Sequence, residues 1–179
     1  LLLLLQELRR LSIDIDIIVP KSVTIAEINE ILKNIVRTSS FTRYEEQERH
    51  YSQIPKAHFK LFYESPFDQS EVYVLLDVLF EENPYSRLDS TDIVCPFIDT
   101  IPPNVTVKVP SIADILGDKL TAFAPNTTGI LYDKEKEMEI IKQLFDIESL
   151  FDQLSTTNGV KDTFIRCAEQ ELNYRQLTE

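Results

Sequence analysis

Two aspartates, Asp14 and Asp16, stand two positions apart near the start of the sequence, within the segment RLSIDIDIIV at residues 10–19. Apolar and polar residues alternate in this segment, which predicts a β-strand with both carboxylates on one face. Neighbouring side chains on one face of a strand lie about 7 Å apart, so the two like charges repel one another. A divalent cation would offset the repulsion, because Mg²⁺ prefers hard oxygen ligands. A half-exposed strand with a solvated acidic face explains the same pattern without a metal.

A third aspartate, Asp77, interrupts the apolar segment 71–80. Apolar residues occupy both faces of this segment, which is typical of a central, buried strand. A carboxylate in such a strand is unfavourable unless it is paired, hydrogen-bonded or bound to a metal. Asp77 is therefore either a third metal ligand or a carboxylate that backbone donors or a nearby Lys or Arg side chain satisfy.

Lys119 lies within the apolar stripe of a predicted helix. Ser111, followed by Asp114 three residues later, predicts the first turn of that helix. The apolar stripe consists of Ile112, Ile115, Leu116, Leu120 and Phe123. The Lys119 side chain then either extends along this apolar surface to water or directs its ammonium group at a buried anion.

Asp146 lies on a longer predicted helix over residues 135–154. The residues that we expect to face the core are Ile140, Leu144, Ile147, Phe151 and Leu154. Asp146 falls on the polar side of the helix, four residues after Lys142, so a surface ion pair explains it without any function.

The other predicted elements must position these residues. A capping box between Thr24 and Glu27 predicts the start of a helix after the first strand. The patterns of the remaining segments predict a loop or short helical turn over 39–53, a strand over 57–64, a loop over 83–91, short extended pieces over 93–98 and 105–109, and a final helix over 160–174.

The composition is that of an ordinary soluble globular protein. The chain has 179 residues, of which 43% are hydrophobic and 27% charged, and this length is sufficient for a sizeable core. With 18 basic and 30 acidic side chains, the net charge is -12. This charge argues against broad, non-specific binding of nucleic acid, although a local basic groove stays compatible with it.

The two cysteines, Cys95 and Cys167, lie far apart and lack the spacing of metal ligands, so we expect free thiols and a reducing cytoplasm. His50 and His58 have no cysteine neighbours, which argues against a zinc site. The sequence contains no segment long and apolar enough to span a membrane.

Three segments together resemble the AbiEii/AbiGii toxin family of the polymerase-beta-like nucleotidyltransferases. Residues 10–16, RLSIDID, resemble the metal-binding signature R-[FL]-S-x-D-[IL]-D of this family. Residues 115–123, ILGDKLTAF, resemble its helix with a lysine in a K-L-x-A context, and residues 142–147, KQLFDI, resemble its later R-D-L-Y-D-L segment. The order and separation of the segments fit the family, and the resemblance covers nearly the whole chain.

The resemblance implies an α+β fold of the polymerase-beta-like type. We then expect a mixed, mainly antiparallel sheet with flanking helices, followed by a helical C-terminal part. The corresponding domains are a nucleotidyltransferase core over 1–110 and a helical part over 111–179 that packs on the core.

The resemblance also assigns the carboxylates. Asp14, Asp16 and Asp77 would be catalytic residues that hold two Mg²⁺ ions, and Asp77 would help to deprotonate the attacking hydroxyl group. A nucleoside triphosphate would be the second substrate beside the hydroxyl acceptor.

Four further site residues follow from the same resemblance. Lys119 would be a catalytic residue that contacts the triphosphate, and Asp146 would be the late acidic residue of the catalytic site. Arg10 and Ser12 would contribute to nucleotide binding.

The sequence departs from the family pattern in two ways. Gln143 stands where the later segment has its first acidic residue, and Lys142 stands where it has arginine. The glycine-rich loop that normally holds the triphosphate is also absent, because the sequence begins within the helix that would follow the loop. We read the five leucines at residues 1–5 as the end of that apolar helix.

The resemblance implies the toxin half of an abortive-infection, type IV toxin-antitoxin system, with a cognate antitoxin encoded nearby. Its activity would be the transfer of a nucleoside monophosphate to a hydroxyl acceptor such as the 3′ end of a transfer RNA. One alternative is a catalytically inactive binding module with the same fold, and retention of the three carboxylates and Lys119 argues against it. A metal-dependent phosphohydrolase is a further alternative.

Overall fold

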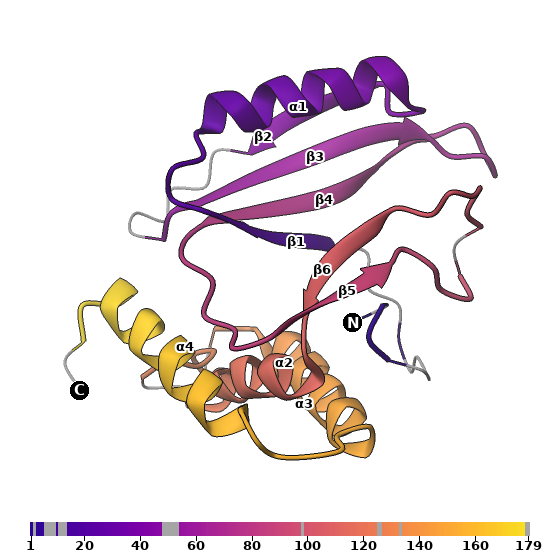
Figure 1. The fold of residues 1–179 in the computed structure, drawn as a ribbon. Helices are drawn as coiled ribbons and strands as arrows, with labels where there is room; N and C mark the ends of the chain where they lie inside the picture. The colour runs from indigo at the N-terminus through magenta and orange to yellow at the C-terminus, as the bar shows by residue number, and fades with distance from the viewer. Residues whose placement is uncertain are drawn as a thin grey trace. The chain divides into compact units, whose positions relative to one another are not determined.

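The computed structural model of the chain describes residues 1, 3–5, 10, 14–47, 54–97, 99–124, 127–132 and 134–177. Ser12, one of the expected nucleotide-binding residues, lies outside these ranges. The chain divides into a sheet unit, Ile13–Asn83, and a helical unit, which consists of Leu1–Ser12 and Pro84–Glu179 (Figure 1). Each unit has its own hydrophobic core.

The sheet unit contains a four-stranded mixed sheet in the order β1-β4-β3-β2. The elements of this unit are β1 (Asp14–Val19), α1 (Ile25–Thr38), β2 (Arg43–Gln47), β3 (Lys56–Glu64) and β4 (Glu71–Phe80). β1 runs parallel to β4, whereas β3 pairs antiparallel with both β2 and β4. β4 therefore has a neighbour on each side, which confirms the central position predicted from its apolar faces.

Helix α1 covers one face of this sheet (Figure 1). The predicted capping box begins the helix: Thr24 Oγ1 accepts a hydrogen bond from the Glu27 N–H at 3.3 Å, and Glu27 Oε2 accepts one from the Thr24 N–H at 2.7 Å. The buried residues between helix and sheet are Ile28, Leu32, Ala57, Phe59, Leu61 and Val78. Because side chains alternate along a strand, the residues that lie between these core positions point to the other face of the sheet.

The part of the helical unit after Pro84 contains a two-stranded ribbon followed by helices. Its elements are β5 (Leu88–Asp92), β6 (Thr106–Pro110), α2 (Ile112–Leu120), the 3₁₀ helix η1 (Thr121–Phe123), α3 (Glu137–Asp152) and α4 (Val160–Tyr174). Its core consists of Leu5, Leu116, Ile147 and Leu150. α2 approaches α4 closely at Gly117, where an added Cβ atom would lie 2.5 Å from the carbonyl oxygen of Val160. A larger residue at this position would push the two helices apart.

The buried carboxylate of Asp114 connects α2 with two other segments of the helical unit. As predicted, Ser111 caps α2, because its Oγ accepts a hydrogen bond from the Asp114 N–H at 3.2 Å. The Asp114 carboxylate accepts hydrogen bonds from the hydroxyl groups of Ser86 at 2.8 Å and Thr163 at 2.5 Å. Burial would raise the pKa of Asp114, but its hydrogen bonds outweigh burial and lower the pKa to about 2.

The predicted α+β class, with a mixed sheet and helices, is confirmed. The strands predicted over 57–64 and 71–80 and the helices predicted over 135–154 and 160–174 are present, with ends that shift by at most two residues. Among the helices of the described residues, none is long and apolar enough to cross a membrane.

Two predicted loops contain strands instead. β2 lies within the segment 39–53, and β5 begins within the segment 83–91. β2 is an edge strand, and its Arg43 forms ion pairs with Glu45 and Glu71. Charged residues are common on edge strands, where they limit pairing with other chains, so a strand of this kind resembles a loop in sequence.

Several large apolar residues of α3 and β1 are exposed. On α3, Leu144 is 57% exposed and Phe151 is 50% exposed, so the predicted core face of this helix is wrong at these two positions. On β1, Ile15 is 51% exposed and Ile17 is 37% exposed. β1 is the other edge strand of the sheet, so it has a neighbouring strand on one side only.

The two compact units meet in sequence between Asn83 and Pro84, whereas the predicted domain boundary lies at residue 110. β5 and β6 pair with each other and not with the four-stranded sheet, and they group with the helices. Because compactness alone does not define a domain, the division at residue 110 stays a prediction.

Candidate functional site

The three predicted metal-binding aspartates lie on one face of the four-stranded sheet. Asp14 and Asp16 are two positions apart on β1, and both are exposed. In the parallel pairing of β1 with β4, Asp16 lies directly opposite Asp77. Opposite residues of paired strands point to the same face, so all three carboxylates share it. This face is the one opposite α1, because Val78, the residue after Asp77, packs in the core beneath that helix.

Asp77 has a partner that the sequence did not indicate. His58 lies opposite Asp77 in the pairing of β3 with β4, and its Nδ1 atom is 2.7 Å from Asp77 Oδ1. The two side chains are 14% and 30% exposed, respectively. A hydrogen bond from His58 satisfies one carboxylate oxygen of Asp77 and fixes the orientation of the side chain. Ala57 and Phe59, the neighbours of His58 on β3, are apolar and face the core beneath α1. Because side chains alternate along a strand, this pattern could have predicted that His58 points to the opposite face.

These three carboxylates share one face and supply the hard oxygen atoms that Mg²⁺ prefers. The chemical type of the donor atoms therefore suits the expected metal. Their side chains are not gathered around one point. In the described part of the chain, no group of three or more His, Cys, Asp or Glu side chains is arranged to hold a metal ion. Asp14, Asp16 and Asp77 as metal ligands therefore stay a prediction.

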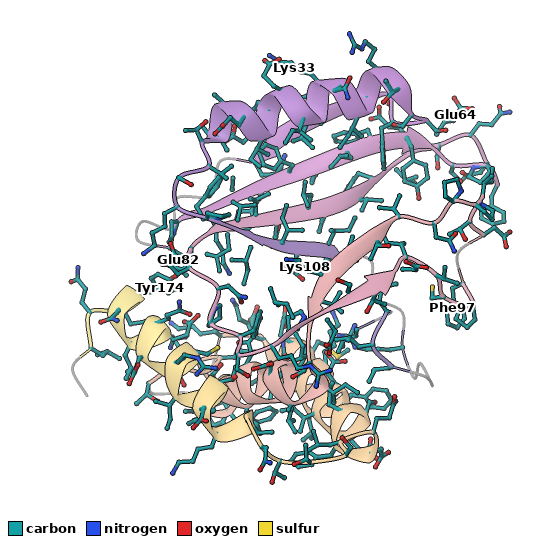
Figure 2. The ribbon with its side chains drawn as sticks, in the orientation of Figure 1. Lys33, Glu64, Glu82, Phe97, Lys108 and Tyr174 are labelled. Carbon is teal, nitrogen blue, oxygen red and sulfur yellow. The ribbon has the colours of Figure 1, made fainter. Side chains whose placement is uncertain are left out.

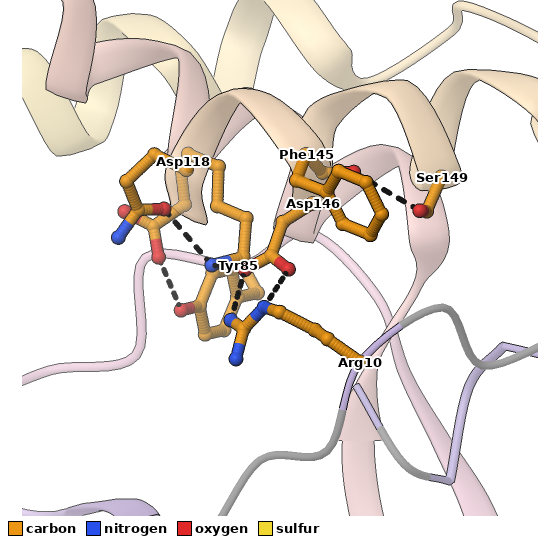
Figure 3. Close-up of polar contacts among 8 residues, drawn as sticks. Arg10, Tyr85, Asp118, Phe145, Asp146 and Ser149 are labelled. Atoms are coloured by element: carbon orange, nitrogen blue, oxygen red, sulfur yellow. Dashed lines mark hydrogen bonds and ion pairs between the residues drawn. The ribbon is translucent and has the colours of Figure 1, made fainter. Parts of the chain in front are cut away.

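A second cluster of predicted site residues forms around Asp146 in the helical unit (Figure 3). The Asp146 side chain is 2% exposed. Arg10 donates two hydrogen bonds to its carboxylate, from Nε at 2.7 Å and from Nη2 at 2.6 Å. Burial would raise the pKa of the Asp146 carboxyl group, but hydrogen bonds from Arg10 and Lys119 and the charges of both groups lower it. Asp146 is therefore ionised and held between two cations.

Lys119 directs its ammonium group into this cluster. Its Nζ atom lies 2.9 Å from Asp146 Oδ2 and donates a hydrogen bond to Gln143 Oε1 at 3.0 Å. Of the two alternatives for Lys119, the buried anion is the observed one, and the anion is the carboxylate of Asp146. The interpretation of Asp146 as a surface partner of Lys142 is wrong, because Asp146 is buried and its partners come from α2 and from the segment before β1.

The cysteines offer no reactive thiol at either cluster. Cys95 and Cys167 are buried and free, as expected. Burial raises the pKa of the Cys167 thiol to about 12, so this group stays protonated at neutral pH.

Comparison with known proteins identifies the family of this chain. The model of the family described as "Nucleotidyl transferase AbiEii toxin, Type IV TA system" matches residues 1–178 of the 179 in this chain. A comparison with curated proteins found no match. The family match covers both clusters, including Asp14, Asp16 and Asp77 of the sheet unit and Lys119 and Asp146 of the helical unit. The chain belongs to the AbiEii family of nucleotidyltransferase toxins of type IV toxin-antitoxin systems.

Proposed function

We propose that this chain transfers a nucleoside monophosphate from a nucleoside triphosphate to a hydroxyl acceptor, and that the acceptor is an RNA such as the 3′ end of a transfer RNA. The observation that carries the proposal is the shared face of Asp14, Asp16 and Asp77 on β1 and β4. Three acidic side chains on one sheet face repel one another, and a reaction that needs a divalent cation explains why they are there. Membership of a type IV system implies an antitoxin partner.

In the proposed reaction, the three carboxylates would hold Mg²⁺, which would supply positive charge to the reacting phosphate. Asp77 accepts the proton of the attacking hydroxyl group, and His58 holds the carboxylate of Asp77 in place for that step through its 2.7 Å contact. Asp14 and Asp16 are exposed and within reach of solvent-borne ligands. No covalent intermediate on the protein is needed.

Lys119 and Arg10 would bind the triphosphate. Arg10 Nη2 lies 2.6 Å and Lys119 Nζ lies 2.9 Å from Asp146 Oδ2. A preorganised cation of this kind stabilises the charge that develops as pyrophosphate leaves. Asp146 acts as a positioning residue, because it holds both cations at hydrogen-bond distance.

The test is to incubate the chain with labelled nucleoside triphosphates, Mg²⁺ and total RNA, and to measure the label in RNA. The wild-type chain should label RNA, whereas Asp14→Asn and Asp16→Asn should lose the label. Glu46→Gln is the matched control, because Glu46 is exposed and lies on the opposite face of the same sheet, at the register position of Phe59. If Glu46→Gln also loses the label, this would contradict the assignment of the activity to the sheet face that carries Asp14, Asp16 and Asp77.

One observation favours the alternative of a catalytically inactive binding module. In the described residues, no three acidic, histidine or cysteine side chains are gathered for a metal ion. An inactive module would bind RNA or nucleotide without consuming the triphosphate. A phosphohydrolase would consume the triphosphate without labelling RNA, so measuring the remaining triphosphate together with the label in RNA separates all three functions.

A further inference from the structure

A row of aromatic and cationic side chains crosses the sheet on the face that carries the three aspartates. In the register of β2, β3 and β4, Arg43 lies opposite Phe62, and Phe62 lies opposite Tyr73. Tyr73 is four residues from Asp77 on β4, an even number, so the row and the carboxylate point to the same face. The Arg43 guanidinium lies 3.5 Å from the centre of the Phe62 ring, and the centres of the Phe62 and Tyr73 rings are 5.6 Å apart.

Of the two aromatic rings in this row, that of Tyr73 is exposed to solvent. It is 47% exposed, whereas Phe62 is 8% exposed. The edge-to-face contact with Phe62, at an interplanar angle of 60°, holds the Tyr73 ring in one orientation. A fixed, half-exposed aromatic ring is a surface on which a nucleobase can stack.

Lys60 lies between this row and the aspartates. It is two residues from His58 and two from Phe62 on β3, and its Nζ atom is 4.3 Å from the centre of the Tyr73 ring. The ammonium group lies over one face of the Tyr73 ring, so a stacked base would use the other face. In the described part of the chain, Lys60 has no ion pair with a carboxylate, whereas Arg43 is paired with both Glu45 and Glu71. The charge of Lys60 is therefore available to a phosphate.

We propose that Tyr73 and Lys60 form a binding platform for the single-stranded end of the acceptor RNA. A base stacks on Tyr73, the adjoining phosphate contacts Lys60, and the terminal hydroxyl group extends towards Asp77. This order follows the strands: Tyr73 is about 13 Å from Asp77 along β4, and Lys60 occupies the row between them. The assignment of RNA as the ligand rests on the proposed function.

The charge of the chain favours a short single-stranded contact over a long duplex. The net charge is -12, so an extended polyanion would meet repulsion over most of the surface. Stacking on an aromatic ring needs no base-specific contact and only one cation beside it. A nucleoside triphosphate also contains a base and phosphates, so it could bind the same two residues. The experiment must therefore distinguish binding of the triphosphate from binding of the RNA.

The experiment measures the affinity of the full chain for a short, fluorescently labelled single-stranded RNA by anisotropy, in EDTA and without nucleotide. Tyr73→Leu keeps an apolar side chain but removes the stacking surface, and we expect it to weaken binding about tenfold. Tyr73→Phe keeps the ring and should bind within about twofold of the wild type. Lys60→Gln should weaken binding and reduce the slope of log affinity against log salt by about 0.7, the value for one phosphate of a single strand.

Lys33→Gln is the matched control for charge. Lys33 projects from α1, the helix on the opposite face of the sheet (Figure 2), and is exposed. This variant removes one positive charge from the same unit and should bind RNA like the wild type. Thermal unfolding of each variant shows whether a loss of binding comes from a loss of folding.

In the binding experiment, two results would overturn the platform: a wild-type chain that does not bind the RNA, or a folded Tyr73→Leu variant that binds as the wild type does. In a separate titration with a nucleoside triphosphate, a loss of triphosphate affinity in the variants with RNA affinity unchanged would overturn it as well. The last result would assign Tyr73 and Lys60 to the nucleotide. Because binding is measured without metal or nucleotide, a chain that fails to transfer nucleotides can still pass this test. If Tyr73→Leu labels RNA as well as the wild type does, the platform is contradicted and the proposed function is not.

Discussion

Arg10 and Lys119 meet the carboxylate of Asp146 at distances of 2.6 to 2.9 Å, in a place where that carboxylate is only 2% exposed. Both cations lower the pKa of the Asp146 carboxyl group and keep it ionised despite its burial. In the proposed reaction, Lys119 and Arg10 would also contact the triphosphate. At the scale of single residues, Lys119 is the side chain that tests this idea best.

Lys119→Met should keep the fold and lose the activity. Methionine has a similar length and fills the same apolar stripe, and Arg10 still pairs with Asp146 in the variant. Because the contact with the leaving phosphates would be lost, we expect kcat for nucleotide transfer to fall about 100-fold or more. Lys142→Met, on the exposed side of α3, is the control and should leave kcat unchanged. Full activity of a folded Lys119→Met variant would show that the charge of Lys119 only balances Asp146.

At the scale of secondary-structure elements, Asp114 connects the first turn of α2 with the segment before β5 and with α4. The partners of its carboxylate are the hydroxyl groups of Ser86, Ser111 and Thr163 and the backbone N–H groups of Ser86 and Arg87. Hydrogen bonds to a buried charged group contribute more to stability than those to neutral groups. The helical unit therefore depends on this ionised carboxylate.

Asp114→Asn should lower the free energy of unfolding by about 2 kcal/mol at neutral pH. The pKa of Asp114 is about 2 in the folded chain and lies below its ordinary value of 3.8. Its stabilising contribution is therefore fully present above pH 4 and is lost as the pH falls from about 4 to about 2. Urea unfolding at pH 7 and pH 3 measures both effects, with exposed Asp99→Asn as the control. Equal pH dependence in Asp114→Asn and the wild type would contradict this account.

Local patterns predicted most of the elements but few of the contacts. The capping residues Thr24 and Ser111 lie beside the helices that they begin, so the sequence contains that information locally. The strand of Asp77 was predictable for the same reason, because its apolar residues are contiguous. β2 was missed because the charges of an edge strand resemble those of a loop.

Contacts between distant segments were not predictable from such patterns. Arg10 is 136 residues before Asp146, so no local period could show that Asp146 is buried. His58 and Asp77 meet only because β3 and β4 pair in one register. The shared face of Asp16 and Asp77 depends in the same way on the pairing of β1 with β4.

At the scale of the whole molecule, the net charge of -12 limits how the chain can bind an RNA acceptor. Electrostatic attraction to phosphate supplies most of non-specific nucleic-acid binding, and here it must come from a few confined cations. We expect weak affinity that falls as the salt concentration rises, measured by anisotropy over a salt series. Tight binding that does not change with salt would contradict this expectation.

Nucleotide transfer is the central claim, and the mass of the RNA product measures it most directly. A defined RNA is incubated with the chain, Mg²⁺ and one nucleoside triphosphate, and its intact mass is determined by mass spectrometry. The account predicts that the RNA gains the mass of one or more nucleoside monophosphate residues with release of pyrophosphate, and that Asp16→Asn abolishes the gain. An RNA of unchanged mass, tested with each of the four nucleoside triphosphates and a transfer RNA pool, would contradict the account.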